Sequence, residues 1–498
     1  MSAIITEKFR QHNASQFVES FTEAAASTYY LFLGKATAYT STTTGGSDSS
    51  PPTPNTGAED EFRAWRSMLG AKLITSSDVK RSIPRRNWSN GATFDMYRHD
   101  YSSSNTSTSG SSDLFDSTFY FMTSDFRVYK VLDNNGGSAF SGSEPTSEST
   151  SPFASGGYVL KYMYTISTSD FSKFGTTDFI PVATDSTVSA AATDGKIESL
   201  VVTSGSGYTD GTYYAAVFGD GTNQGTSSGA IVRITVSSGA IVSFGLTAGT
   251  DTTIHAGGAG YTFGFVNLGD DYIFSDASLS SSASLGGGSG GAIEVIISPD
   301  GGHGSDAVQE LGGHFVMLAT TLTQAEGDDF TTANDFRSVG IVVDPTNFGT
   351  STVATASTRR QTYIVKVDTN SGTFEADERI TQATTGAVGK VVEFDSSLSL
   401  LYYQQEEFKG FGTNATTGGY VAFSGTNQIT GASSGATGTT AGTTETVTLA
   451  NANTVTLTSG YANPELAFPS GNIIYLENRK PIQRASDQTE DIKVIIEF

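Results

Sequence analysis

The chain has 498 residues, a formal net charge of −23 and no cysteine. Its length allows about two to four domains, and the lack of cysteine excludes disulfides, thiolate metal sites and cysteine nucleophiles. The excess of 51 Asp and Glu over 28 Lys and Arg disfavours binding to nucleic acid or to an anionic membrane. The sequence starts without a signal peptide, and no apolar run approaches a membrane span. We therefore expect a soluble protein made in the cytoplasm of its host.

The composition is typical of a chain built mainly from β-strands. It includes 56 Gly, 21 Tyr and 31 Phe but only 16 % charged residues. Aromatic and β-branched residues suit half-buried pleated surfaces, whereas Gly, Ser and Asn form the turns between strands. The aromatic content of 11 % argues against disorder over most of the chain.

Two segments near the N-terminus have the apolar spacing of a helix. The first is Ala14–Ala26, for which Asn13 is the expected N-cap. The second is Ala58–Leu69, which carries Trp65 on its apolar face and is expected to end at Gly70. We expect their aromatic residues to pack in the core; the alternative is a stripe that faces a partner.

Short apolar or alternating runs predict strands before the middle of the chain. They are Tyr29–Leu33, Phe119–Met122, Val128–Leu132 and Tyr158–Ile166. Stretches rich in Gly, Ser and Thr at 40–57, 102–112 and 134–157 are expected to be surface loops.

Two regions contain internal repeats and predict inserted β-modules. Around 195–302, Gly229–Val236 returns as Gly291–Ser298, and Asp220-Gly221 predicts a tight hairpin turn. Around 352–460, Phe374–Thr381 returns as Phe423–Thr430. The predicted organisation is therefore a core at 1–194, 303–351 and 461–498, interrupted by modules at 195–302 and 352–460.

No arrangement of residues predicts catalysis or a cofactor. The five histidines lack a metal-binding spacing, and no catalytic triad, phosphate loop or dinucleotide fingerprint is present. Gly301–Asp306 matches one calcium-binding repeat, but a single copy supplies half a site, so a plain turn is preferred. We expect no catalytic, cofactor-binding or metal-binding residue, and no enzyme.

The segment Lys80–Trp88 is basic within an acidic chain. Arg85, Arg86 and Trp88 are candidate interface residues, because Arg and Trp are enriched where proteins bind each other. The alternative is that the arginine side chains bind acceptors within the chain. Both interpretations stay open.

Several short blocks of the sequence resemble blocks that occur in the same order in the gene-8-type baseplate wedge subunit of T-even-like, contractile-tailed bacteriophages. The basic segment contains Ile83–Trp88 (IPRRNW), similar to that family's I-P-R-R-[DN]-W. The other blocks are Thr6–Arg10 (TEKFR), Val128–Asp133 (VYKVLD), Gly157–Tyr162 (GYVLKY), Phe336–Pro345, Ile474–Ile482 (IYLENRKPI) and Asp487–Ile492 (DQTEDI). They mark out regions at roughly 1–182, 315–348 and 464–498, which make up about half of the chain and leave out the two repeat regions.

The last block adds Glu477 and Arg479 as candidate interface residues. They are two apart on a predicted strand, so their side chains project to the same side. Such a pair could bracket a neighbouring subunit, and the alternative, which we favour, is that the two side chains brace each other or a loop at the edge of the core.

The resemblance implies a layered β-sandwich core with two helix-bearing loops, here carrying two inserted small β-modules. It also implies a homodimer that joins other baseplate wedge proteins in the virion tail. The acidic charge adds the expectation of no nucleic acid or membrane partner. The alternative function is a tail adhesin that binds glycans on the host surface, which the inserted modules would provide. A polysaccharide-cleaving enzyme would need a cleft of converging carboxylates, for which the sequence offers no support.

Overall fold

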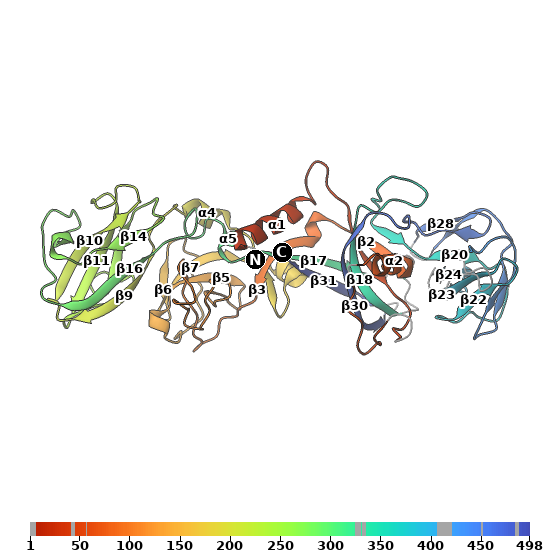
Figure 1. The fold of residues 1–498 in the computed structure, drawn as a ribbon, viewed down its shortest axis with the longest axis horizontal. Coiled ribbons are helices and arrows are strands. Elements are labelled where there is room, and N and C mark those ends of the chain that lie inside the picture. The colour runs from red at the N-terminus through yellow and green to blue at the C-terminus, as the bar shows by residue number, and fades with distance from the viewer. Residues whose placement is uncertain are drawn as a thin grey trace. The chain divides into compact units, whose positions relative to one another are not determined.

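The computed structural model describes residues 6–40, 45–55, 57–323, 330, 335–405, 421–449, 452–483 and 488–498. The chain divides into two units. The first comprises residues 1–18, 80–317 and 494–498, and the second comprises residues 19–79 and 318–493. Antiparallel sheets dominate both, which confirms the predicted mainly β fold (Figure 1). Within the described residues, no helix combines the length and the hydropathy that crossing a membrane requires.

The core of the first unit is built around a sheet with the strand order β4-β5-β7-β6. Strands β5 and β7 are buried at nearly every position, because both faces of this sheet are covered. They therefore appear in the sequence as mostly apolar runs, each interrupted by one lysine, Lys130 or Lys161. The elements in this unit or reaching into it are α1 (Glu7–Glu19), β3 (Val79–Pro84), β4 (Tyr120–Met122), β5 (Arg127–Asp133), η2 (Asn135–Gly137), β6 (Phe153–Ser155), β7 (Tyr158–Thr165), α3 (Thr168–Phe174), β8 (Phe179–Pro181), α4 (Ser186–Ala191), α5 (Ala307–Glu310), β17 (Phe315–Leu322) and β31 (Glu490–Glu497).

The strands between residues 195 and 302 form a β-module of the first unit (Figure 1). Its first and last strands pair with each other, from Ser199 opposite Ile296 to Ser206 opposite Ser289. Leu132 and Val159 of the neighbouring sheet join its apolar core, so the module packs directly on that sheet. Its elements are β9 (Ser199–Ser206), β10 (Gly211–Gly219), β11 (Ala230–Ser237), β12 (Ala240–Ile241), β13 (Thr253–Gly257), β14 (Gly264–Val266), η3 (Asp270–Tyr272), β15 (Ile273–Phe274) and β16 (Ser289–Ile296).

A buried ion pair links strand β5 to the segment that follows this module. The side chains of Lys130 and Glu310 are 0 % and 2 % exposed, and the ammonium group contacts the Glu310 carboxylate. The backbone amide of Gly304 donates to that carboxylate at 2.8 Å, and the amide of Asp306 at 3.2 Å. The ammonium group also lies 5.0 Å from the centre of the Tyr97 ring. A buried charge needs such partners, because burial alone strongly disfavours it.

The second unit contains a five-stranded sheet with the order β19-β2-β1-β18-β30. Helix α2 packs against this sheet through Trp65, which is 1 % exposed, so the prediction that this aromatic residue lies in the core is confirmed. The elements are β1 (Tyr29–Gly34), α2 (Ala58–Ser67), β2 (Met68–Ile74), η1 (Ser76–Asp78), β18 (Asp335–Val343), β19 (Thr358–Arg360) and β30 (Asn472–Gln483).

The second repeat region forms an eight-stranded sheet with its own apolar core. Equivalent strands of the two repeats pair with each other, because Ile380 lies opposite Gly431 and Thr381 lies opposite Thr430. The strands of this region are β20 (Tyr363–Lys366), β21 (Thr369–Ser371), β22 (Arg379–Gln382), β23 (Ala387–Asp395), β24 (Leu400–Gln404), β25 (Ile429–Gly431), β26 (Thr437–Thr439), β27 (Glu445–Thr448), β28 (Thr454–Leu457) and β29 (Tyr461–Ala462).

The four predicted strands near the N-terminus are confirmed within one residue at each end, as β1, β4, β5 and β7. The boundaries of the first helix are wrong. It spans Glu7–Glu19, and Asn13 lies inside it rather than at its N-cap. The hydroxyl oxygen of Thr6 accepts a hydrogen bond from the backbone amide of Phe9 at 3.3 Å. Thr6 is therefore the N-cap residue, which the prediction missed.

Two further sequence predictions are corrected by strand pairing. Helix α2 stops at Ser67 rather than at Gly70, because the chain is already extended at Met68, where β2 begins to pair with β1. Asp220-Gly221 does not form a two-residue hairpin turn, because residues 220–229 all lie between β10 and β11. The Asp220 carboxylate instead accepts the amides of Thr262 and Phe263.

Lys130→Met is expected to lower the free energy of unfolding by about 3–5 kcal/mol, because it leaves the Glu310 carboxylate buried without its cation. Urea denaturation followed by circular dichroism measures this loss. The double variant Lys130→Met/Glu310→Gln should recover part of it, since neither charge remains. A single variant as stable as the parent would show that the ion pair does not support the core.

Candidate functional site

The five predicted interface residues are divided between the two units. Arg85, Arg86 and Trp88 belong to the first unit, and Glu477 and Arg479 belong to the second. In the first unit, β3 ends at Pro84, and the two arginines follow directly after it.

Arg85 is held by a neighbour in its own segment and by helix α3 with the loop that follows it. Its guanidinium donates to the backbone oxygen of Thr176 at 2.8 Å and to the side chain of Asn87 at 2.9 Å. The same group lies 5.2 Å from the centre of the Phe171 ring on helix α3. Arg85 therefore bridges the end of β3 to the loop that follows α3.

Arg86 and Trp88 pack against the core of the same unit. The Arg86 guanidinium donates to the backbone oxygen of Phe115 at 2.9 Å and lies 4.4 Å from the centre of the Tyr120 ring. The Trp88 ring meets Phe140 edge-on at 5.8 Å between ring centres. These contacts show the arginine side chains bound to acceptors within the chain, which is one of the two interpretations of the sequence. Docking of this segment to a partner stays a prediction.

Glu477 and Arg479 contact each other on strand β30. The Arg479 guanidinium lies 3.0 Å from the Glu477 carboxylate, and both side chains are partly exposed. The Tyr475 hydroxyl donates to the same carboxylate at 2.7 Å. Burial, followed by this nearby negative charge, raises the pKa of Tyr475. The expected same-side projection is therefore observed, and the pair braces itself.

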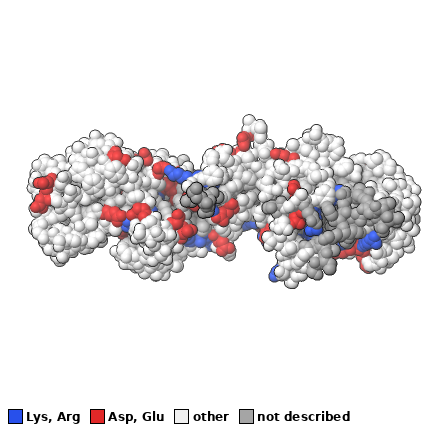
Figure 2. Space-filling view, viewed as in Figure 1, with Lys and Arg blue, Asp and Glu red and all other residues white. Residues whose placement is uncertain are grey.

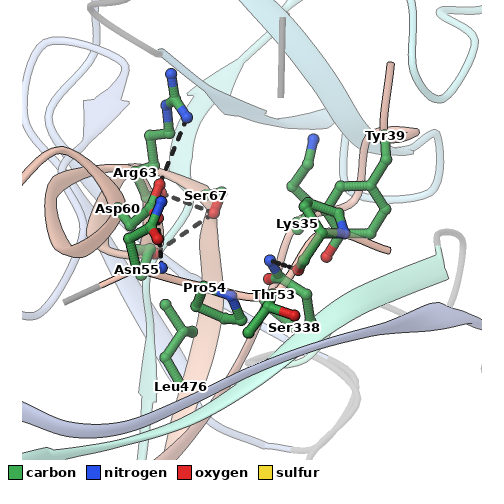
Figure 3. A pocket seen from close by; sticks show the side chains of 13 residues that line it. Lys35, Tyr39, Thr53, Pro54, Asn55, Asp60, Arg63, Ser67, Ser338 and Leu476 are labelled. Atoms are coloured by element: carbon green, nitrogen blue, oxygen red, sulfur yellow. Dashed lines mark hydrogen bonds and ion pairs between the residues drawn. The ribbon is translucent and has the colours of Figure 1, made fainter. Parts of the chain in front are cut away.

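A cavity of about 140 Å³ lies beside β30, between helix α2 and the chain around Pro54. Figure 3 shows Asn55, Asp60 and Arg63 gathered at one side of this cavity and Lys35 and Tyr39 at the other. A second hollow lies next to it and is lined by Pro54, Gly57 and residues 473–476, among others.

Hydrogen bonds fix the polar wall of the cavity. The Asp60 carboxylate accepts the amide of Asn55 at 2.7 Å and lies 3.5 Å from the Arg63 guanidinium. Across the cavity, the Asn478 side chain donates to the backbone oxygen of Pro52 at 2.8 Å, which ties the proline-rich chain to β30. The cavity thus presents both charges and amide groups on a fixed frame.

The sequence prediction did not include these cavity residues. It assigned residues 40–57 to a surface loop, although the run of three prolines at Pro51, Pro52 and Pro54 restricts the backbone and could have signalled a rigid segment. Asp60 and Arg63 are three apart on a helix, so their side chains share a face.

The segment Gly301–Asp306 forms turns. The Asp306 carboxylate accepts the amides of Val308 and Gln309 at the start of α5 and the Thr184 hydroxyl. His303 is buried with its ring edge-on to Tyr97 at 4.9 Å between ring centres, and this burial keeps the pKa of His303 well below its usual value. Across the part of the chain that the structure describes, no three acidic or histidine side chains converge as metal ligands would.

Two separated parts of the chain match a known protein family. Residues 3–139 and 443–498 match the family model described as Phage-Gp8, from Bacteriophage T4, Gp8. This match supports a structural protein of a bacteriophage baseplate. The matched segments contain the sequence blocks Thr6–Arg10, Ile83–Trp88, Val128–Asp133, Ile474–Ile482 and Asp487–Ile492, so the resemblance to the gene-8-type family is confirmed over the matched residues. No curated protein matches the chain.

Trp88→Ala is expected to lower the free energy of unfolding by roughly 3 kcal/mol, because it removes a large ring packed on Phe140. Arg479→Ala should change it by less than about 1 kcal/mol, because the exposed pair with Glu477 is screened by water. Urea denaturation followed by circular dichroism compares the two. Equal losses for both variants would contradict the structural difference described between the two segments.

Proposed function

We propose that the chain is a baseplate wedge subunit, which forms a homodimer and joins neighbouring wedge proteins during tail assembly. Its role is non-catalytic, and it is assembled in the host cytoplasm into the virion. The main observation behind the proposal is which residues the family match covers. Residues 443–498 contain the whole of β30, and the two matched segments contain every residue that lines the cavity except Ser338.

Strand β30 has the properties of a binding edge. It is the last strand in the order β19-β2-β1-β18-β30, and among the described residues it pairs with β18 alone. Its 12 residues are long for a strand at an edge, and Ile474 remains 47 % exposed. An unpaired edge offers backbone donors and acceptors to a strand of another chain.

The cavity beside β30 would add specificity to such an edge. Binding energy between proteins concentrates where an anchoring side chain fills a pocket. Here the pocket walls carry the Lys35 ammonium group, the Asp60 carboxylate and the Arg63 guanidinium. An anchor from a neighbouring subunit that carries a polar end could bind these groups while its apolar part contacts Leu476.

The mass of the full-length protein in solution tests the proposal. Analytical ultracentrifugation should give a dimer of about twice 52.1 kDa, and mixing with the wedge proteins of the same phage should give a larger complex. Ile474→Arg should weaken the larger complex at least about tenfold, since it places an extra charge on the docking edge.

Leu246→Arg is the matched control, because Leu246 is also an exposed aliphatic residue, at 39 %, but lies in the module of the first unit. This variant should enter the complex like the parent. A monomer that ignores every wedge protein would contradict the proposed function. A complex that forms equally well with both variants would contradict the role of β30 alone.

A further inference from the structure

Four aromatic side chains gather on the surface of the β-module at 195–302. Phe263 and Phe265 are 56 % and 52 % exposed, and Tyr272 is 40 % exposed. The Phe218 ring joins them, because it stacks on Phe265 at 5.9 Å between ring centres and meets Tyr272 edge-on at 5.6 Å. We call these four residues the aromatic patch.

Strand pairing explains why these rings face outward. Phe218 of β10 lies directly opposite Phe265 of β14, and Val217 lies opposite Val266. Because side chains alternate along a strand, Val217 and Val266 turn toward the module core while the two phenylalanines turn away from it. A cluster of exposed aromatic rings costs solvation free energy and is typical of an interaction surface.

Carboxylates border the aromatic patch. Asp220 accepts the amides of Thr262 and Phe263 at 2.9 and 3.1 Å. Hydrogen bonds, first of all from the Thr262 side chain, lower the pKa of Asp220. Asp270 and Asp271 directly precede Tyr272 in the sequence.

Cations are scarce in the same module. Residues 195–302 contain nine Asp and Glu against two Lys and Arg. Lys196 is paired with Glu198 at 2.8 Å, and Arg233 lies opposite Tyr214, four residues along β10 from Phe218. Figure 2 shows red acidic atoms and no blue ones at the outer end of this module, at the left of the view.

We propose that the aromatic patch binds a basic segment of a neighbouring particle protein. Arginine or lysine side chains of that segment would lie over the rings, where a cation is attracted to the ring face. They would also lie within reach of Asp220, Asp270 and Asp271, so that opposite charges meet across the interface. The inference rests on the proposed function, because it takes the chain to be part of an assembled particle.

A glycan fits the same surface less well. Sugar recognition requires several polar groups that converge on hydroxyl groups of the ligand. Here the Asp220 carboxylate already accepts two backbone amides, and the Asp270 carboxylate accepts the Ser284 hydroxyl at 2.6 Å. An uncharged glycan would gain only hydrogen bonds from the acidic border, whereas a basic protein segment would also gain the attraction between opposite charges.

Photo-crosslinking of assembled particles tests the inference. Phe265 of the full-length protein is replaced by p-benzoylphenylalanine, the particles are irradiated, and the adducts are mapped by mass spectrometry. The expected adduct joins position 265 to a segment of another particle protein that contains Arg or Lys. Replacing both aspartates, as Asp270→Asn/Asp271→Asn, should lower the yield of this adduct by roughly threefold.

The same probe at Leu246, in the same module, gives the background, and at Ile474 it reports the β30 edge. An adduct at 474 but none above background at 265 would overturn this inference and leave the proposed function standing. Adducts from 265 to an acidic or uncharged segment, or to host polysaccharide, would also overturn it. Absence of the chain from purified particles would instead refute the proposed function.

Discussion

Lys130 carries its ammonium group into the core of the first unit, where the side chain is fully buried. Burial lowers the pKa of Lys130, and the Glu310 carboxylate opposes that effect. The pair is satisfied only when α5 and the turn at Gly304 lie against β5, since the Gly304 amide also binds the carboxylate. The segment that follows the module must therefore pack at one defined position against β5. Within the first unit, the position of the module and of its aromatic patch depends on that packing.

The sequence predicted the strands better than the helices, for a physical reason. A fully buried strand such as β7 needs apolar side chains at nearly every position, so it stands out as a continuous run. Helix α1 has few buried residues, and its place is fixed by contacts with distant parts of the chain, such as the Arg10 bond to the backbone oxygen of Phe498 at 2.5 Å. Phe21, which the pattern placed on the helix, instead stacks on Tyr29 at 4.2 Å.

The candidate sites were only partly predictable. Spacing alone placed Glu477 and Arg479 on one side of a strand, and their 3.0 Å contact follows from it. The cavity could not be foreseen in the same way, because Asn55 and Asn478 come together only when the proline-rich chain crosses β30. The aromatic patch depends likewise on the register of β14 against β10, which repeats in the sequence do not encode. The domain boundaries proposed from composition remain predictions.

Both modules begin and end on adjacent strands. Ser199 lies opposite Ile296 in the first, and Ile364 lies opposite Ala462 in the second. A segment whose two ends are neighbours can be lengthened, shortened or exchanged while the strands on either side keep their spacing, because the closure entropy of a loop grows only slowly with its length. The modules and the strands that flank them can therefore change at different rates during evolution. Under the proposed function, such changes within a module leave the strands that flank it in place.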